Sequence, residues 1–138
     1  MIRARSLALA MLVAPLGVAL VPHHAAQAES REGYASTFEA AAFDAAVASG
    51  EPVLVEVSAP WCPTCRAQKE VLGDLLGRPD YAGFTVFAVD FDSRKDVLRQ
   101  LDARAQSTLI VWAEGREVGR SVGDASPEGI ERLLASAL

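Results

Sequence analysis

Short apolar runs alternate with amphipathic segments along most of this chain. Four runs predict strands, three of them nearly continuous in apolar residues and the last one amphipathic: residues 52–58, 84–91, 108–113 and 117–122. Four segments with apolar residues at helical spacing predict helices: residues 36–49, 63–76, 93–103 and 126–138. The predicted order is therefore α-β-α-β-α-β-β-α.

Residues that start and stop helices set the predicted boundaries. Ser36 and Glu39 have the spacing of a capping box, in which each side chain satisfies a backbone N–H of the first turn. Gly50 follows the predicted end of the same helix. Ser93 can cap the third helix, and Pro127 suits the first position of the last one.

This order predicts an α/β fold with a mixed sheet of four to five strands and helices on both faces. Right-handed crossovers would make the first three strands parallel, and the tight turn at Glu114-Gly115 would add the fourth as an antiparallel edge. A domain of this length buries roughly two-thirds of its unfolded surface. The cysteines are therefore not needed to hold the fold together.

The N-terminus has the organisation of a secretory signal. Arg3 and Arg5 precede an uncharged stretch at residues 7–21, and small residues flank Gln27 at the expected cleavage site after Ala28. We expect a signal peptide at residues 1–28, a single domain at 29–138 and a periplasmic location. An uncleaved anchor is the alternative, but the stretch is shorter than the roughly 20 residues that span a bilayer.

Composition limits the kinds of catalytic site, metal site and partner that the processed chain can have. Residues 1–28 contain Arg3 and Arg5 but no Asp or Glu. Their removal lowers the number of Lys and Arg residues from 13 to 11 and leaves 18 Asp and Glu residues. His23 and His24 are lost as well. Without histidine, residues 29–138 cannot form a Cys–His dyad, a Ser–His–Asp triad or a His-ligated metal site. The acidic balance also argues against nucleic acid as a partner.

The two cysteines, Cys62 and Cys65, lie one helical turn apart where a strand meets a helix. Unpaired backbone N–H groups and the helix dipole favour a thiolate at Cys62, so we expect it to be the partly exposed nucleophile and Cys65 the resolving thiol. Pro63 fits the first helical turn. A structural disulfide and half of a metal site are the alternatives, but the loop is short and zinc takes four ligands. We expect no cofactor beyond this redox-active pair.

The sequence Trp61-Cys62-Pro63-Thr64-Cys65, with the strands around it, resembles the thioredoxin family over residues 36–138. The resemblance implies a thioredoxin fold and a thiol–disulfide oxidoreductase that acts on protein disulfides. The motif Cys62-Pro63-Thr64-Cys65 is similar to that of thioredoxin-like proteins that reduce apocytochrome c. The opening Glu51-Pro52-Val53 and the compact length are more similar to the C-terminal thioredoxin-like domain of membrane thiol reductases. We therefore expect a reductant or electron carrier that is regenerated by an upstream membrane thiol reductase.

The resemblance also assigns further site residues. Glu56 matches the buried acid that relays a proton to the resolving thiol, although a solvent-facing strand residue is the alternative. It implies substrate contacts for Trp61, Pro63, Ser107 and Thr108 beside the pair. Core support is the alternative role for Trp61.

Ser107 occupies the position where this family has a cis-proline. A cis bond before a non-proline residue costs about 2.5–4 kcal/mol, so we expect the Gln106–Ser107 bond to be trans. Family precedent leaves open a second function, in which two such cysteine pairs bind a metal or an iron–sulfur cluster. A thiol-dependent binding module with little turnover belongs to the same alternative.

Overall fold

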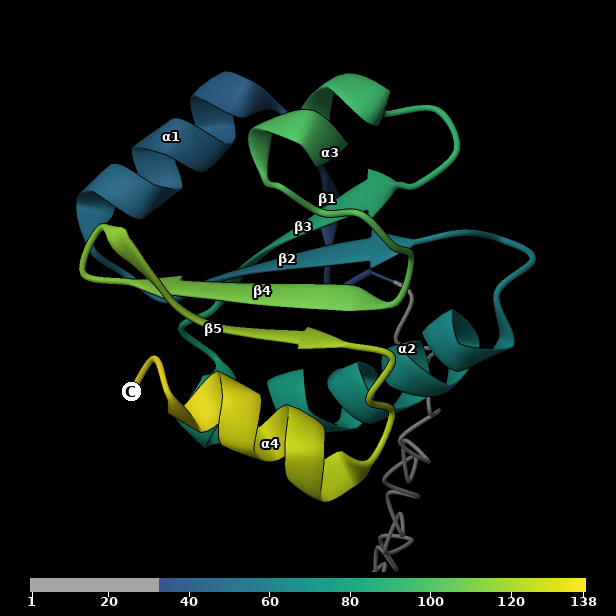
Figure 1. Ribbon diagram of the computed structural model, residues 1–138. Coiled ribbons are helices and arrows are strands. Elements are labelled where there is room, and N and C mark those ends of the chain that lie inside the picture. Colours follow the sequence, from purple (N-terminus) through teal and green to yellow (C-terminus); the bar gives the residue numbers. More distant parts are fainter. Residues whose placement is uncertain (1–32) are drawn as a thin grey trace, which may run out of the picture.

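The computed structural model describes residues 33–138, so the expected signal peptide lies outside the described residues. Five strands form one sheet in the order β1-β3-β2-β4-β5 (Figure 1). The strands are β1 (Ser36–Thr37), β2 (Val53–Ser58), β3 (Thr85–Asp90), β4 (Thr108–Ala113) and β5 (Arg116–Val122). The helices are α1 (Ala40–Ser49), α2 (Pro63–Leu76), α3 (Lys95–Gln100) and α4 (Pro127–Ala135), with a 3₁₀ turn at Pro79–Tyr81.

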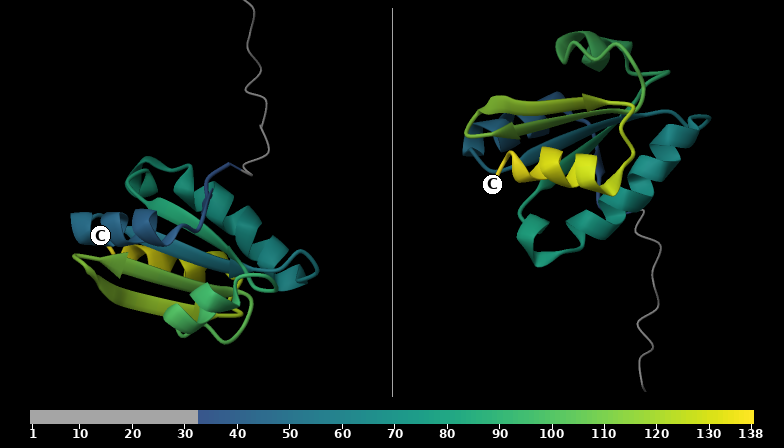
Figure 2. Two further views of the ribbon diagram at one scale, coloured as in Figure 1. Left: turned by 90° about the horizontal axis from the view of Figure 1, so that it is seen from above. Right: turned by 60° about the horizontal axis from the view of Figure 1, so that its bottom comes forward.

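Helices cover both faces of the sheet, as the sequence predicts. α1 and α3 lie on one face, and α2 and α4 lie together on the other (Figures 1 and 2). No helix within residues 33–138 has the length and apolar character needed to cross a bilayer. The fold class is therefore confirmed as α/β, with a mixed five-stranded sheet.

The predicted direction of β4 is wrong. β1, β2 and β3 are mutually parallel, but β4 runs antiparallel to β2, with Thr108 opposite Val57. The reason lies in α3, which has six residues and spans only about 9 Å, whereas the six-residue β3 extends about 20 Å. Because α3 is too short to carry the chain back along the sheet, β4 starts near the end where β3 finishes.

The capping box predicted at the first helix is also wrong. Ser36 and Thr37 form β1 beside Phe87 and Ala88, and α1 begins only at Ala40. The N-cap of α1 is Glu39, whose side chain makes no capping hydrogen bond. A place on the edge of the sheet supplies backbone partners for this segment, which a local capping motif does not reveal. The predicted end of this helix is confirmed, because Gly50 adopts the left-handed conformation there.

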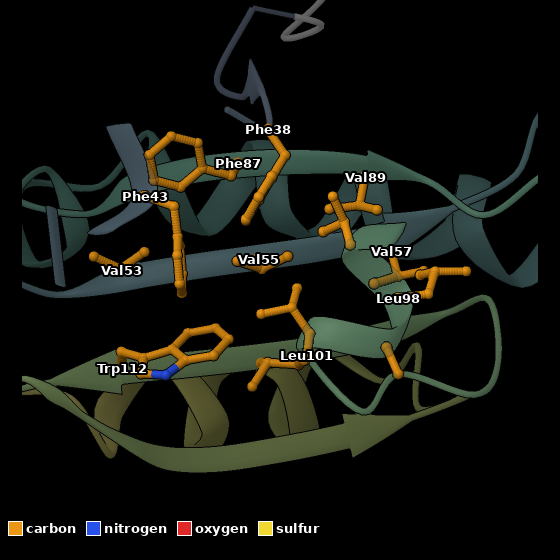
Figure 3. Close-up of a cluster of buried hydrophobic side chains, with 13 residues drawn as sticks. Phe38, Phe43, Val53, Val55, Val57, Phe87, Val89, Leu98, Leu101 and Trp112 are labelled. Carbon is orange, nitrogen blue, oxygen red and sulfur yellow. The ribbon is translucent and has the colours of Figure 1, made fainter. Parts of the chain in front are cut away.

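An aromatic cluster fixes α1 against the sheet. Phe43 is the buried residue of α1, and its ring lies 5.1 Å from the rings of both Phe38 and Trp112 (Figure 3). Valines of β2 and residues of α3 complete this side of the core. Ala42 and Ala45 of α1 are exposed, whereas Ala46 and Val47 are partly buried against the same cluster.

The opposite face of the sheet packs against α2 and α4. Its fully buried side chains include Leu54, Leu72, Leu109, Ile130 and Leu134. The start of α4 is as predicted, because Pro127 is its first residue and the Ser126 hydroxyl accepts the N–H of Gly129 at 3.2 Å. The two cores hold β2 at the centre of the sheet, and α2 leads away from the end of this strand.

Candidate active site

The cysteine pair lies at the N-terminus of α2, directly after the central strand β2. Cys62 is the N-cap residue of this helix, and Cys62 and Cys65 form a disulfide with their Cα atoms 5.3 Å apart. The Sγ atom of Cys62 also accepts a hydrogen bond from the backbone N–H of Cys65 at 3.1 Å. Cys62 therefore occupies the helix end where unpaired N–H groups and the helix dipole favour negative charge on sulfur.

The expected exposure of Cys62 is wrong for this disulfide form. Cys62 is only 2% exposed and Cys65 only 1%, with Ala59 and Phe91 packed against them. Cys62 is covered because Ala59, Phe91 and Ser107 pack against the pair. The disulfide is therefore buried, but the residues on either side of Cys62 form an exposed surface next to it.

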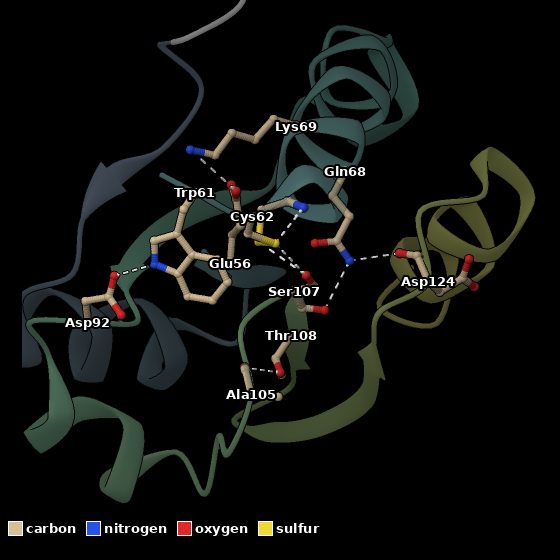
Figure 4. The surroundings of a disulfide bond; sticks show 11 residues. Glu56, Trp61, Cys62, Gln68, Lys69, Asp92, Ala105, Ser107, Thr108 and Asp124 are labelled. Atoms are coloured by element: carbon tan, nitrogen blue, oxygen red, sulfur yellow. Dashed lines mark hydrogen bonds and ion pairs between the residues drawn. A yellow bond between two sulfur atoms is a disulfide. The ribbon is translucent and has the colours of Figure 1, made fainter. Parts of the chain in front are cut away.

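That surface includes Trp61 and Pro63, the neighbours of Cys62. Trp61 is 57% exposed, so the alternative that it supports the core is wrong. Its indole N–H donates to the carboxylate of Asp92 at 2.8 Å, which holds the ring at the molecular surface beside the disulfide (Figure 4). Pro63 is the exposed first residue of α2. A backbone N–H at this position would have no acceptor within the helix, so a proline costs no hydrogen bond here.

The segment that enters β4 brings Ser107 to the disulfide. No cis peptide bond occurs in residues 33–138, so the bond before Ser107 is trans as predicted. Ser107 is buried, and its Oγ atom lies 3.1 Å from Cys62 Sγ and 3.2 Å from Cys65 Sγ. Thr108 is also buried, and its hydroxyl donates to the carbonyl of Ala105 at 2.7 Å.

Glu56 is a buried acid in the middle of β2, and the solvent-facing alternative is wrong. It is 1% exposed and lies between Ala88 of β3 and Leu109 of β4. Burial raises the pKa of this carboxyl above its ordinary value, although its hydrogen bond with Tyr34 and the charge of Lys69 oppose that shift. Figure 4 shows its carboxyl group beside the disulfide, on the side of Lys69.

Sequence reasoning missed three residues of this site. The Tyr34 hydroxyl donates to Glu56 Oε2 at 2.8 Å, and the Lys69 ammonium lies 3.9 Å from Oε1. Gln68, one turn beyond Cys65, is fully buried. The sequence could have indicated Gln68, because a residue three places after Cys65 lies on the same face of α2 as Cys65.

The surroundings of the pair bear on the metal-binding alternative. Among residues 33–138, no group of three or more histidine, cysteine, aspartate or glutamate side chains is arranged to hold a metal ion. Within the chain, the two sulfurs are bonded to each other. The chemistry that this arrangement supports directly is the opening and closing of the Cys62–Cys65 bond.

The sequence model of the thioredoxin family, described as Thioredoxin, matches residues 35–136, nearly all of the described chain. The chain belongs to the thioredoxin family. It is 33% identical to Thioredoxin-2 of Saccharomyces cerevisiae over 98 residues, which cover 70% of this chain and 91% of that protein. Thioredoxin H-type of Fagopyrum esculentum is 30% identical over 69% of this chain and 80% of its own length.

Comparison of structures agrees with this assignment. The crystal structure of Trxlp from Edwardsiella tarda EIB202 has a TM-score of 0.69 and 44% sequence identity, covering 71% of this chain and 95% of that one. The thioredoxin of Malassezia sympodialis has a TM-score of 0.64 at 19% identity, over 72% of this chain and 88% of its own, and shows the shared fold. The fold is the thioredoxin fold, and the protein is a thioredoxin-type protein-disulfide oxidoreductase.

Proposed function

We propose that this thioredoxin-family protein is a periplasmic reductant or electron carrier, with Cys62 as nucleophile and Cys65 as resolving thiol. The observation that carries the proposal is the hydrogen bond from the Cys65 N–H to Cys62 Sγ at the N-terminus of α2. A backbone N–H at a helix end stabilises a thiolate at Cys62 more than the neutral thiol. Cys65, inside the first turn, lies within bonding distance of Cys62.

The reaction proceeds in two exchanges. The Cys62 thiolate attacks one sulfur of a substrate disulfide, which forms a mixed disulfide and releases the other substrate sulfur as a thiolate. The Cys65 thiolate then attacks Cys62 Sγ, which forms the intramolecular disulfide and releases the second substrate sulfur. Two electrons pass from the protein dithiol to the substrate, and the two protons of the dithiol end on the substrate thiols.

Glu56 is the proposed acceptor for the proton of Cys65. A carboxyl whose pKa is raised by burial holds and releases a proton closer to neutral pH than an exposed glutamate does. Tyr34 and Lys69 stabilise its charged form, so both protonation states are supported at this site. The exposed residues Trp61 and Pro63 are the proposed contacts for a substrate backbone.

The residues between the cysteines support the proposed reducing direction. Pro63 and Thr64 carry no charge, so neither residue between the cysteines adds a cation to the stabilisation that the helix end gives the thiolate. A moderately stabilised thiolate gives a weaker oxidant than a strongly stabilised one. Because the periplasm is oxidising, such a reductant needs an upstream membrane thiol reductase to restore its dithiol.

Reduction of a model protein disulfide by the purified dithiol form tests the activity. We expect the wild-type protein to reduce it, Cys62→Ser to be inactive, and Cys65→Ser to accumulate the mixed disulfide. Ser136→Ala, a change at the exposed residue that follows α4, is the matched control. Activity that survives Cys62→Ser would contradict the assignment of the nucleophile.

Fractionation of cells that produce the full chain tests the location. We expect a protein in the periplasmic fraction that begins at Glu29, with Cys65→Ser trapping mixed disulfides there. Protein that stays in the cytoplasm with residues 1–28 attached would contradict the periplasmic proposal. An empty trap in the periplasm would contradict exchange with partners in that compartment.

A further inference from the structure

The hydroxyl of Ser107 contacts both sulfur atoms of the active-site disulfide. Its Oγ atom is 3.1 Å from Cys62 Sγ and 3.2 Å from Cys65 Sγ, and the residue is 4% exposed (Figure 4). A disulfide carries no hydrogen, so the hydroxyl is the donor in these contacts, and it has one hydrogen to donate. Ser107 therefore offers a hydrogen bond to one sulfur at a time.

The backbone around Ser107 is held in place from two directions. Ser107 has a φ of 59°, in the left-handed region that non-glycine residues rarely adopt. Its carbonyl accepts the N–H of Gly123 at 2.9 Å and the side-chain amide of Gln68 at 3.1 Å. The same amide nitrogen donates to the carbonyl of Asp124 at 2.8 Å. Gln68, itself fully buried, thus ties the segment before β4 to the segment after β5.

We propose that Ser107 is a catalytic residue whose hydroxyl donates a hydrogen bond to whichever active-site sulfur carries the negative charge. The inference rests on the exchange reaction proposed above. Before attack the charge is on Cys62, and before resolution it is on Cys65. The hydroxyl reaches both sulfurs in the observed arrangement, so it can follow the charge without movement of the backbone. Ser107 keeps its proton throughout and forms no covalent bond.

The contribution of Ser107 differs for the two cysteines. Cys62 Sγ has a second donor, the N–H of Cys65. For Cys65 Sγ, the Ser107 hydroxyl is the hydrogen-bond partner found within residues 33–138. A proline at position 107 would offer no donor to either sulfur. Gln68 is the proposed positioning residue, because it holds the carbonyl of Ser107 and thereby the direction of the hydroxyl.

The pH dependence of Cys62 alkylation in the reduced protein tests this proposal. Ser107→Ala and Ser107→Gly both remove the hydroxyl, but only glycine suits the left-handed backbone. Loss of a hydrogen bond to a charged sulfur should raise the apparent pKa of Cys62 by about one unit in both variants, which is about a tenfold smaller thiolate fraction below that pKa. The charged groups drawn around the pair, Glu56, Lys69, Asp92 and Asp124, are unchanged in these variants.

Equilibration with glutathione gives a second measurement. The thiolate exists only in the reduced protein, so loss of its donor should move the equilibrium by up to about tenfold toward the disulfide. The proposal would be overturned if both variants had the alkylation profile and the glutathione equilibrium of the wild type. A shift of these quantities in Ser107→Ala but not in Ser107→Gly would assign the effect to backbone strain.

A Gln68→Met variant tests the positioning role. It keeps the size of the side chain but removes the amide, so its alkylation profile should move in the same direction as that of Ser107→Ala. An unchanged profile would refute the positioning role of Gln68. Alkylation needs no disulfide substrate, so these results are separate from any failure of the wild-type protein to reduce protein disulfides.

Discussion

Removal of a single hydroxyl group, in Tyr34→Phe, tests the electrostatic environment of Glu56. The hydroxyl donates to Glu56 Oε2 at 2.8 Å, and the acceptor is almost fully buried. Burial raises the folded-state pKa of Glu56 above its ordinary value of 4.5, and the bond from Tyr34 opposes that rise. The variant should therefore raise the pKa of Glu56 further.

The sign and size of the effect on stability follow from this shift. As pH rises above 4.5, the unfolded chain releases the Glu56 proton first, so the contribution of Glu56 to stability falls until the folded-state pKa is passed. Tyr34 limits that fall by stabilising the carboxylate. Tyr34→Phe should cost about 1 kcal/mol at about pH 4, where the acid is neutral, and more at about pH 8, up to about 1.5–3 kcal/mol, because the bond from Tyr34 is stronger to the ionised carboxyl and ionisation increases as pH rises.

Urea unfolding of the oxidised protein at these two pH values measures the difference. Tyr81→Phe is the matched control, because its hydroxyl makes only a 3.5 Å contact with Glu131, whose side chain is 40% exposed. The control should lose less than about 0.5 kcal/mol at both pH values. In a Glu56→Gln background the pH dependence of Tyr34→Phe should disappear. A loss from Tyr34→Phe that is equal at both pH values would show that the Tyr34 hydroxyl does not stabilise the charged form of Glu56 over the neutral form.

Two further predictions concern the scaffold. Ser126→Ala removes the hydroxyl that accepts the Gly129 N–H at the start of α4, and should lower the free energy of unfolding by about 1 kcal/mol in urea; an unchanged midpoint would show that this cap contributes nothing. Phe43→Ala opens a cavity among the rings of Phe38, Phe87 and Trp112 and should cost about 3–5 kcal/mol by thermal unfolding, whereas a loss below about 1 kcal/mol would mean that α1 is not anchored by this ring.

Local sequence signals predicted most elements of this fold. The apolar runs of β2 and β4 are confirmed because both strands are buried on both faces. The end of α1 at Gly50 and the start of α4 at Ser126 depend on neighbouring residues alone, and both predictions are confirmed. The motif around Cys62 and Cys65 is equally local, since it needs only a strand followed at once by a helix.

The predictions that were wrong depend on distant partners. The direction of β4 depends on how far α3 carries the chain, and α3 is shorter than its apolar pattern indicates. Ser36 joins the sheet because Phe87 lies beside it, which no local motif records. Tyr34 lies before β1 and Lys69 lies on α2, so the residues around Glu56 in the sequence do not reveal that these two side chains contact it. The burial of Cys62 likewise depends on Phe91, which follows β3.

Competitive alkylation shows whether Cys62 is the activated thiol of the pair. The fully reduced wild-type protein is treated with less than one equivalent of iodoacetamide at neutral pH, and the labelled peptides are quantified by mass spectrometry. Because Cys62 is the N-cap of α2 and accepts the N–H of Cys65, we expect the label mainly on Cys62, at a rate well above that of an unperturbed thiol. Label that favours Cys65, or a Cys62 rate equal to that of free cysteine, would contradict this account.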